Sequence, residues 1–289
     1  MSYYKYLKYK YKYYKKLNNN IHLPIHKFVK QSKLMKKSID TITMTKTANK
    51  SFIFLNVDLT KNEKQIILSP NFGNIEEPNF NYYGTIRYDI LSKQLDNYLA
   101  QFYQKNSTEI SKILVDKIIK PFVVATDKDS FWCMMRFMEP STEYDIPRWH
   151  QDGPLVPYEV EPNQNGIGIR LISTLFGPGT LFKIDNSEMK NKFLEMDNEL
   201  YSKLSAPFVP GESLNIINHY RKITDEELKK YPQVQLKNGQ IAIFITNPGN
   251  IATIHSEPKV NHSRLIFSVT AADKSYIQKI ADMADQKFL

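Results

Sequence analysis

The sequence predicts a mainly β fold with flanking helices, of the α+β class, and three observations support this prediction. Residues 131–138 and 264–269 form apolar runs of strand length. Residues 167–182 indicate a strand, a Gly/Pro turn and a second strand. Residues 88–119, in contrast, carry apolar side chains at helical spacing. We therefore expect a β core with helices packed against it.

The chain ahead of this core begins with a predicted strand at residues 51–59, which alternates in the way that a strand does. Two supporting helices are expected within residues 88–119. Their apolar positions include Leu91, Leu95, Leu99 and Phe102. A polar break at residues 105–107 separates the two helices, and we expect Ser107 to cap the second one.

The second half of the chain carries signals for both helices and a hairpin. Residues 187–204 predict a helix that is inserted between core strands. Thr224 and Glu227 form a capping-box pattern, which predicts a short helix at residues 225–230. An Asn-Gly pair at residues 238–239 lies between two strand-like runs and predicts a hairpin.

With 289 residues, the chain is long enough for one large domain with a buried core. We expect residues 51–289 to form that domain and residues 1–50 to form a basic, poorly ordered tail. Within the domain, the expected parts are the N-terminal strand and helices at 51–130, the β core at 131–272 with a helical insertion at 186–232, and a C-terminal helix at 273–286.

The positive charge of the chain is confined to its beginning. Residues 1–50 contain 13 lysines and a single acid, Asp40, whereas the remaining residues contain 26 basic and 29 acidic side chains. Lysine interleaved with tyrosine could contact an anionic partner, either nucleic acid or a membrane surface. The alternative interpretation is a solvated leader of biased composition.

The remaining bulk properties are typical of a soluble intracellular protein. The only cysteine, Cys133, lies in an apolar strand-like run and is expected to be a buried structural thiol. The sequence has no signal-peptide pattern and no transmembrane-length apolar run. We therefore expect a reducing compartment, with the cytoplasm as the simplest location. The sequence does not indicate the oligomeric state.

One short motif points to chemistry. His150 and Asp152 are separated by one residue, so an extended strand would direct both side chains to the same face. His255 supplies a third candidate ligand, and Arg264 follows it in an apolar run. Two imidazoles and one carboxylate on one face of Fe(II) leave three positions open for reactants. Arg264 could hold a carboxylate through two parallel hydrogen bonds. This order of residues suggests a non-haem iron oxygenase.

Several nearby residues have alternative interpretations. His262 could replace His255 as a ligand, but it lies only two residues before Arg264. His219 could touch substrate or be an ordinary surface histidine. Arg170 could contact a substrate anion or 2-oxoglutarate, or it could pair with a carboxylate in the wall of the core. Trp149 could line the pocket or simply belong to the core.

Residues 131–272 resemble the double-stranded β-helix core of the Fe(II)/2-oxoglutarate-dependent dioxygenases. The resemblance implies that His150, Asp152 and His255 hold Fe(II), that Arg264 binds 2-oxoglutarate, and that O2 is the second co-substrate. The residues Arg170-Leu171, Thr174 and Gly177-Pro178-Gly179-Thr180 are also similar to a little-studied domain family of unknown function within this fold group.

The sequence departs from these families in three places. The family often has a serine two residues after its arginine, whereas this chain has Ile266, which leaves Ser268 as the nearest hydroxyl on that strand face. A second arginine typical of the nucleic-acid repair branch is absent from this strand. The loop at residues 153–166 is longer than in the domain family, and its stretch at 154–162 could act as a lid or be a surface excursion.

The sequence therefore predicts a dioxygenase that hydroxylates or oxidatively demethylates its substrate, with a protein side chain or a small molecule preferred. One alternative is a non-catalytic β-helix protein that binds a metal or a small acid without turnover. Another is a protein that binds nucleic acid or a different anionic partner through its basic tail, with the barrel as a scaffold.

Overall fold

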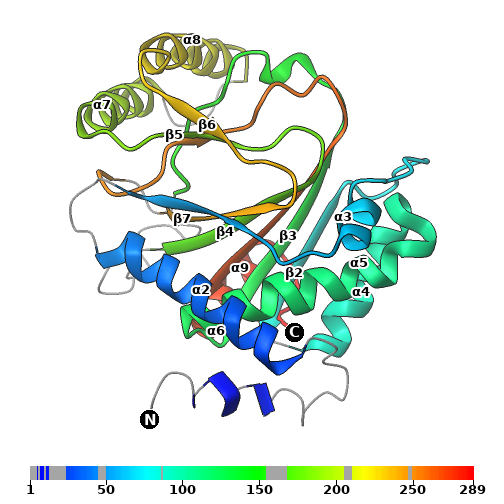
Figure 1. Cartoon of the computed structure of the whole chain (residues 1–289). Coiled ribbons are helices and arrows are strands. Elements are labelled where there is room, and N and C mark those ends of the chain that lie inside the picture. Colours follow the sequence, from blue (N-terminus) through cyan, green and yellow to red (C-terminus); the bar gives the residue numbers. More distant parts are fainter. Residues whose placement is uncertain are drawn as a thin grey trace.

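The computed structural model describes residues 5, 7–9, 11–12, 24–44, 50–85, 87–153, 168–204, 210–246 and 249–289. Its centre consists of two antiparallel sheets (Figure 1). The larger sheet contains, in spatial order, β1 (Phe52–Asn56), β7 (Gln240–Thr246), β4 (Gly168–Phe176), β9 (Arg264–Ala272), β3 (Ser130–Met138) and β2 (Asn79–Thr85). The smaller sheet contains β6 (Gln233–Gln235), β5 (Leu181–Lys183) and β8 (His255–Ser256).

Successive core strands alternate between the two sheets. The chain leaves the larger sheet after β4 to form β5, returns from β6 to β7, crosses again to β8 and returns to β9. Apolar side chains from both sheets meet between them, among them Phe182 of β5 and Phe244 of β7, whose ring centroids are 5.7 Å apart. This winding between facing sheets is the predicted double-stranded β-helix architecture.

The strand alternation divides the larger sheet into two chemically different faces. On β9, Leu265, Phe267 and Val269 belong to the main apolar core, to which side chains of the helices also contribute. The intervening residues, including Arg264 and Ser268, face the smaller sheet, because neighbouring residues of a strand point to opposite faces. Polar groups are therefore gathered on the inner face and protected from water by both sheets.

Helices cover the outer face of the larger sheet (Figure 1). These are α2 (Ile25–Met44), α4 (Tyr88–Tyr103), α5 (Ser107–Ile113) and α6 (Lys120–Thr126), with the short α3 (Lys61–Ile67) beside them. A 3-10 turn, η1 (Gln104–Asn106), joins α4 to α5, and a π-helical segment, η2 (Leu114–Ile119), joins α5 to α6. A second 3-10 turn, η3 (Thr142–Tyr144), follows β3, and α9 (Lys274–Met283) packs on β2 and β3 near the end of the chain.

The helical insertion lies where the sequence predicts it, between β5 and β6, although its second helix is longer than expected. It contains α7 (Ser187–Lys203) and α8 (Pro210–Leu228), which stand over the smaller sheet in Figure 1. Asn186 caps α7 through a side-chain hydrogen bond to the amide of Met189 (2.9 Å). The predicted short helix at residues 225–230 is wrong, because Thr224 lies inside α8 and starts no helix.

Two further local predictions are also wrong. Ser107 does not cap α5, because its hydroxyl donates instead to Asp96 of α4 (2.6 Å). The Asn-Gly pair makes a turn, with Gly239 at a φ of 82°, but no hairpin results. The strands on either side pair in different sheets, β6 with β5 and β7 with β1 and β4. The turn chemistry was recognised correctly, whereas the strand partners depend on distant segments.

The expectation of a poorly ordered tail is wrong for residues 25–44. They form α2, whose side chains Phe28, Met35 and Ile42 are buried in the main core. Earlier in the chain, Leu7 is fully buried, and the ring of Tyr11 lies 5.5 Å from that of Phe28. The lysines of this region therefore lie on segments that also contribute to the core, because every third or fourth side chain is apolar.

Within the described residues, the helices are each too short or too polar to cross a membrane.

We expect Phe28→Ala to lower the free energy of unfolding by about 3–5 kcal/mol, the usual effect of removing a buried aromatic side chain. Phe28 is almost completely buried and contributes to the main core. Urea denaturation followed by circular dichroism measures the effect, with the exposed Lys30→Ala as the control from the same helix. Equal stability of the two variants would contradict the placement of α2 in the core.

Candidate metal centre

The structure brings the His-x-Asp motif against the strand that carries His255. The amide of His150 donates to the carbonyl of His255 (2.9 Å), and the amide of His255 donates to the carbonyl of His150 (3.0 Å). The imidazole ring centroids lie 4.3 Å apart as a consequence. Phe182 and Phe244 pack against the ring of His255 at 5.8 and 5.0 Å, which restricts its orientation. Two segments far apart in the sequence thus present their histidines side by side.

Asp152 completes a three-residue cluster. Its Oδ1 lies 3.8 Å from His150 Nε2, and its Oδ2 lies 3.7 Å from His255 Nε2. One ligand atom from each residue lies within 4.8 Å of the other two. Two ring nitrogens and a carboxylate oxygen therefore converge on one point, with a spacing that suits a shared ion better than direct hydrogen bonds.

The hydrogen bonds of the rings prepare both histidines to act as ligands. His150 Nδ1 lies 2.8 Å from the carbonyl oxygen of Arg148, and His255 Nδ1 lies 3.4 Å from that of Thr253. A carbonyl oxygen only accepts hydrogen bonds, so these contacts assign the hydrogen to Nδ1. Nε2 is the ring nitrogen that lies near Asp152, at 3.8 Å for His150 and 3.7 Å for His255. Backbone contacts of this kind commonly orient metal-bound histidines.

The charges in the cluster also suit a cation. Burial, followed by the nearby His150, lowers the pKa of His255 to about 4, so this ring is neutral near pH 7. Burial alone would raise the pKa of Asp152, but Arg170, His255 and His150 outweigh it and lower the pKa below its ordinary value. The site therefore offers a neutral imidazole and an ionised carboxylate, the protonation states that metal binding requires.

Arg170 lies next to this carboxylate. Its Nη1 donates to Asp152 Oδ2 (2.7 Å), and its Nε donates to Thr270 Oγ1 (3.0 Å). The guanidinium also lies 5.6 Å from the ring of Trp132. These contacts hold Oδ2, so Oδ1 is the oxygen that is available to an ion. Of the two interpretations of Arg170, the structure favours the arginine that pairs with a carboxylate in the wall of the core.

Arg264 occupies the inner face of β9 and is only 1% exposed. Its Nε donates to the carbonyl of Pro178 (2.8 Å), and its Nη2 donates to Thr180 Oγ1 (2.8 Å). Among the described residues, no carboxylate forms an ion pair with this guanidinium. Burial lowers its pKa to about 10, although the more distant charge of Glu257 opposes the shift. A buried cation without a paired carboxylate favours an anion as its partner.

The turn between β4 and β5 supplies both oxygen contacts of Arg264, and two glycines make this turn possible. Gly177 has a φ of 82°, and a Cβ there would lie 2.4 Å from the carbonyl oxygen of Ser263. At Gly179, a Cβ would lie 1.7 Å from the carbonyl oxygen of Leu236. Any larger side chain would push the turn away from its neighbours. The Gly-Pro-Gly-Thr stretch therefore positions the carbonyl and the hydroxyl beside Arg264.

Two hydroxyls share the inner face with Arg264. Thr174 on β4 is directly opposite Ile266, and Ser268 on β9 is directly opposite Ile172. Thr174 is 1% exposed, and its Oγ1 has no hydrogen-bond partner within the described part of the chain. An unsatisfied buried hydroxyl is costly unless a ligand or water binds it. The interior thus contains a hydroxyl suited to an oxygen-rich ligand.

The other sequence candidates lie elsewhere. His262 is exposed and is not part of the cluster. His219 lies exposed on α8, with its ring 5.7 Å from that of Tyr220. Trp149 is buried, donates from its indole to Asp225 (3.1 Å) and lies under the ammonium of Lys183. We therefore assign Trp149 to core packing rather than to the wall of a pocket. The predicted lid at residues 154–162 lies outside the described residues.

Three residues near the cluster were missed in the sequence. Gln151 lies between His150 and Asp152, and its side-chain amide forms hydrogen bonds with the backbone of Gly249 and Ala252. These bonds fix the segment that carries the two predicted ligands. Glu257 accepts from Arg148 at one oxygen (2.5 Å), while its buried Oε2 has no partner among the described residues. Burial raises the pKa of Asp197 on α7, and the charge of His150 opposes that shift. Of the three, only Gln151 lies within the His-x-Asp motif.

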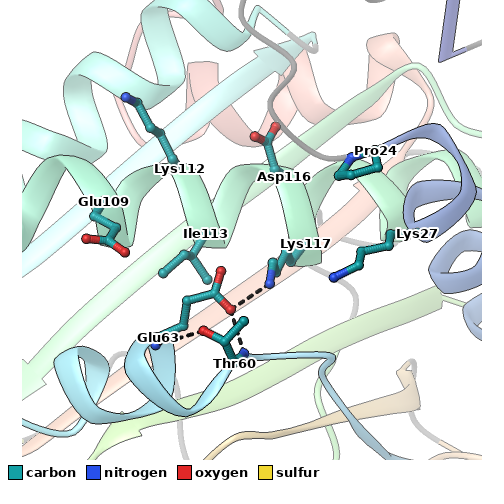
Figure 2. Close-up of a pocket in the computed structure, with 9 residues that line it drawn as sticks. All are labelled: Pro24, Lys27, Thr60, Glu63, Glu109, Lys112, Ile113, Asp116 and Lys117. Carbon is teal, nitrogen blue, oxygen red and sulfur yellow. Dashed lines mark hydrogen bonds and ion pairs between the residues drawn. The ribbon is translucent and has the colours of Figure 1, made fainter.

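A cavity of about 300 Å³ lies on the opposite, helical side of the larger sheet (Figure 2). It is lined by Pro24, Lys27, Thr60, Glu63, Glu109, Lys112, Ile113, Asp116 and Lys117. Figure 2 shows Lys117 directed at Glu63, at an N–O distance of 2.6 Å, and Glu63 closing a capping box with Thr60. These charges join α3 to η2. The cavity contains no member of the His-Asp-His cluster.

No protein-family model matches the chain, and no curated protein matches its sequence significantly. Several solved structures are weakly similar. A Pseudomonas putida prolyl-4-hydroxylase is 10% identical, with 83% of this chain and 98% of that one covered at a TM-score of 0.35. The Kdo hydroxylase KdoO, a non-haem Fe(II) α-ketoglutarate-dependent dioxygenase solved with cobalt(II), is 15% identical. The match covers 88% of this chain and 92% of that one, at a TM-score of 0.35. EvdO2 from Micromonospora carbonacea var. aurantiaca is 11% identical, and the match covers 83% of this chain and 90% of that one at a TM-score of 0.36. Similarity this low decides neither the fold nor the activity.

We expect Co(II) to bind the purified chain at one site, and His150→Ala or His255→Ala to weaken that binding by at least about 100-fold, beyond the usual effect of losing an outer contact of a metal ligand. Each substitution removes one of three converging ligand atoms. Isothermal titration calorimetry under oxygen-free conditions measures the affinity.

His262→Ala is the matched control, because it removes an exposed histidine that lies outside the cluster. It should bind Co(II) as tightly as the unaltered chain. If His262→Ala abolishes binding while His255→Ala retains it, the assignment of the third ligand is wrong.

Proposed function

We propose that this protein is an Fe(II)- and 2-oxoglutarate-dependent dioxygenase that hydroxylates or oxidatively demethylates its substrate. The observation that carries the proposal is the pairing of two features on one protected interior. One is the His150, Asp152 and His255 cluster, whose donor set is that of a non-haem iron site. The other is the buried cation of Arg264, which has no carboxylate partner among the described residues.

The residues fit iron through their chemistry. Two Nε2 lone pairs and one carboxylate oxygen would hold Fe(II) on one face, leaving the other positions open to reactants. When bound, iron would couple the oxidation of a substrate C–H bond by dioxygen to the conversion of 2-oxoglutarate into succinate and carbon dioxide. Arg170 would keep Asp152 ionised and oriented through its hydrogen bond to Oδ2.

The same interior fits the co-substrate. Arg264 would bind the distal carboxylate of 2-oxoglutarate, and Thr180 would hold the guanidinium in place. Thr174 would donate its unsatisfied hydroxyl to that carboxylate, with Ser268 as a second hydroxyl on the same face. The apolar side chains of Ile172, Phe182 and others between the sheets would keep bulk water away. In this arrangement Arg170 serves the metal ligand rather than the co-substrate.

We favour a protein side chain or a small molecule as the substrate. The strand that carries Arg264 has no second arginine of the kind associated with the nucleic-acid repair branch. The insertion of α7 and α8 stands over the smaller sheet and brings Asp197 near His150, so it is a natural element for substrate selection. The competing function is binding of a metal or small acid without turnover.

Anaerobic addition of Fe(II) and 2-oxoglutarate should produce the visible charge-transfer band of an iron-bound 2-oxo acid. Arg264→Lys keeps the charge but loses the planar pair of donors, so about 10-fold more 2-oxoglutarate should be needed for half of the band, as expected for one charge-assisted hydrogen bond. Arg87→Lys alters an exposed arginine far from the cluster and should leave the titration unchanged.

Admission of oxygen then separates an enzyme from a binding protein. Succinate should accumulate slowly even without substrate, and it should not accumulate with Asp152→Ala. A folded protein that binds Co(II) but gives no band would disprove the 2-oxoglutarate assignment. A band without any succinate would favour the non-catalytic alternative.

A further inference from the structure

We propose that the outer surface formed by residues 5, 7–9, 11, 12 and α2 is a docking site for single-stranded nucleic acid. This basic surface consists of the exposed lysines Lys5, Lys12, Lys30, Lys33 and Lys37 together with Tyr9. The inference is independent of the proposed oxygenase chemistry, because the basic surface and the metal centre lie on opposite faces of the larger sheet.

The helix α2 supplies a fixed row of positive charge. Lys30, Lys33 and Lys37 follow one another at intervals of three and four residues, so they share one face of the helix. The row extends about 10 Å along the axis at 1.5 Å per residue. The only acid of α2, Asp40, pairs with Lys36 of the adjacent row. The three lysines of the row outnumber this single acid, so the exposed face of α2 is positive.

The opposite face of α2 fixes this row in place. Phe28, Met35 and Ile39 are buried in the main core, together with Ile241 and Ile243 from the outer face of β7. A charged row on an anchored helix loses little conformational freedom when it binds, unlike the same lysines on a flexible chain. The arrangement therefore favours a defined contact over diffuse attraction.

The described residues 5, 7–9, 11 and 12 add charge and an aromatic ring beside α2. The ring of Tyr11 lies 5.5 Å from that of Phe28, which joins the two segments directly. Tyr9 is 63% exposed, whereas Leu7 and Tyr11 are buried. In Figure 1, the blue N-terminal pieces lie along the same side of the molecule as α2. An exposed tyrosine between lysines can stack on a base while the ammonium groups contact phosphates.

These features favour nucleic acid over a membrane. A helix that lies in a membrane surface presents a continuous apolar face to the lipid. In α2 that face is used in the core, and Leu34, at 41% exposure, is the large apolar side chain left on the outside. Single strands are favoured over duplex because Tyr9 requires unpaired bases for stacking.

The surface would recruit the protein to a polyanion without contributing to the reaction. Ile243 of β7 contributes to the core beneath α2, while its neighbour Phe244 packs on His255 on the other side. Loss of the lysines should therefore leave metal binding and the 2-oxoglutarate titration unchanged. Failure of the oxygenase proposal would likewise leave this inference standing, since nucleic-acid binding needs no metal.

Fluorescence anisotropy with a labelled 20-nucleotide oligo(dT) tests the proposal on the full chain, at several salt concentrations. We expect binding that weakens steeply with salt, and Lys30→Gln/Lys33→Gln/Lys37→Gln should weaken it at least about 10-fold. The slope of log affinity against log salt should fall by about 2, given roughly 0.7 for each phosphate contact to a single strand. Tyr9→Leu should weaken binding about fivefold or more through lost stacking.

The matched control is Lys203→Gln/Lys222→Gln/Lys279→Gln, which removes the same charge from exposed positions on α7, α8 and α9. It should bind oligo(dT) like the unaltered chain. The proposal is overturned if the control loses as much affinity as the α2 variant, or if no binding occurs at 50 mM salt, a concentration at which phosphate contacts are strong. Binding to phosphatidylserine vesicles without binding to oligo(dT) would also overturn it.

Discussion

The reciprocal backbone hydrogen bonds between His150 and His255 are the contact on which the candidate site depends. They join a segment that follows β3 to a two-residue strand of the smaller sheet. Because β8 also pairs with β5, His255 is held on its other side as well, and the bridge places His150 beside it. Gln151 adds to this connection by binding the backbone at Gly249 and Ala252. The three ligand atoms converge because two strands are paired.

The second constraint is the separation of the two faces of the larger sheet. One face packs on the helices through apolar side chains such as Leu265 and Phe267. The other carries Arg170 and Arg264, two guanidiniums with different partners. Arg170 is satisfied by Asp152, whereas within the described part of the chain Arg264 meets only neutral oxygens and a methionine sulfur. Under the proposed function, this difference in pairing suits Arg170 to orienting a metal ligand and Arg264 to binding an incoming anion.

The N-terminal region shows how one helix can serve both folding and binding. Its apolar side chains complete the core on the outer face of the sheet, and its lysines are therefore exposed on a rigid support. Composition alone suggested a solvated tail, because thirteen lysines in fifty residues outweigh a sparse apolar pattern. Burial of Phe28 and Met35 against β7 and α6 stabilises the helix in spite of its charge.

Local patterns predicted much of the secondary structure. The strand at 131–138, the helix beginning at residue 187 and the turn at Gly239 all depend on neighbours in the sequence, and each was found. Partners were harder to predict. The strands on either side of Gly239 belong to different sheets, and Ser107 binds Asp96 rather than its own helix. Such choices depend on segments that the fold brings together.

The candidate site follows the same division. Residue type and spacing singled out His150, Asp152, His255 and Arg264, because ligand chemistry and strand alternation are local properties. Spacing already favoured His255 over His262, whereas only the tertiary structure paired Arg170 with Asp152 and left Thr174 without a partner among the described residues. Those outcomes depend on which distant groups become neighbours when water is excluded, and a buried polar group gains or lacks a partner only at that stage.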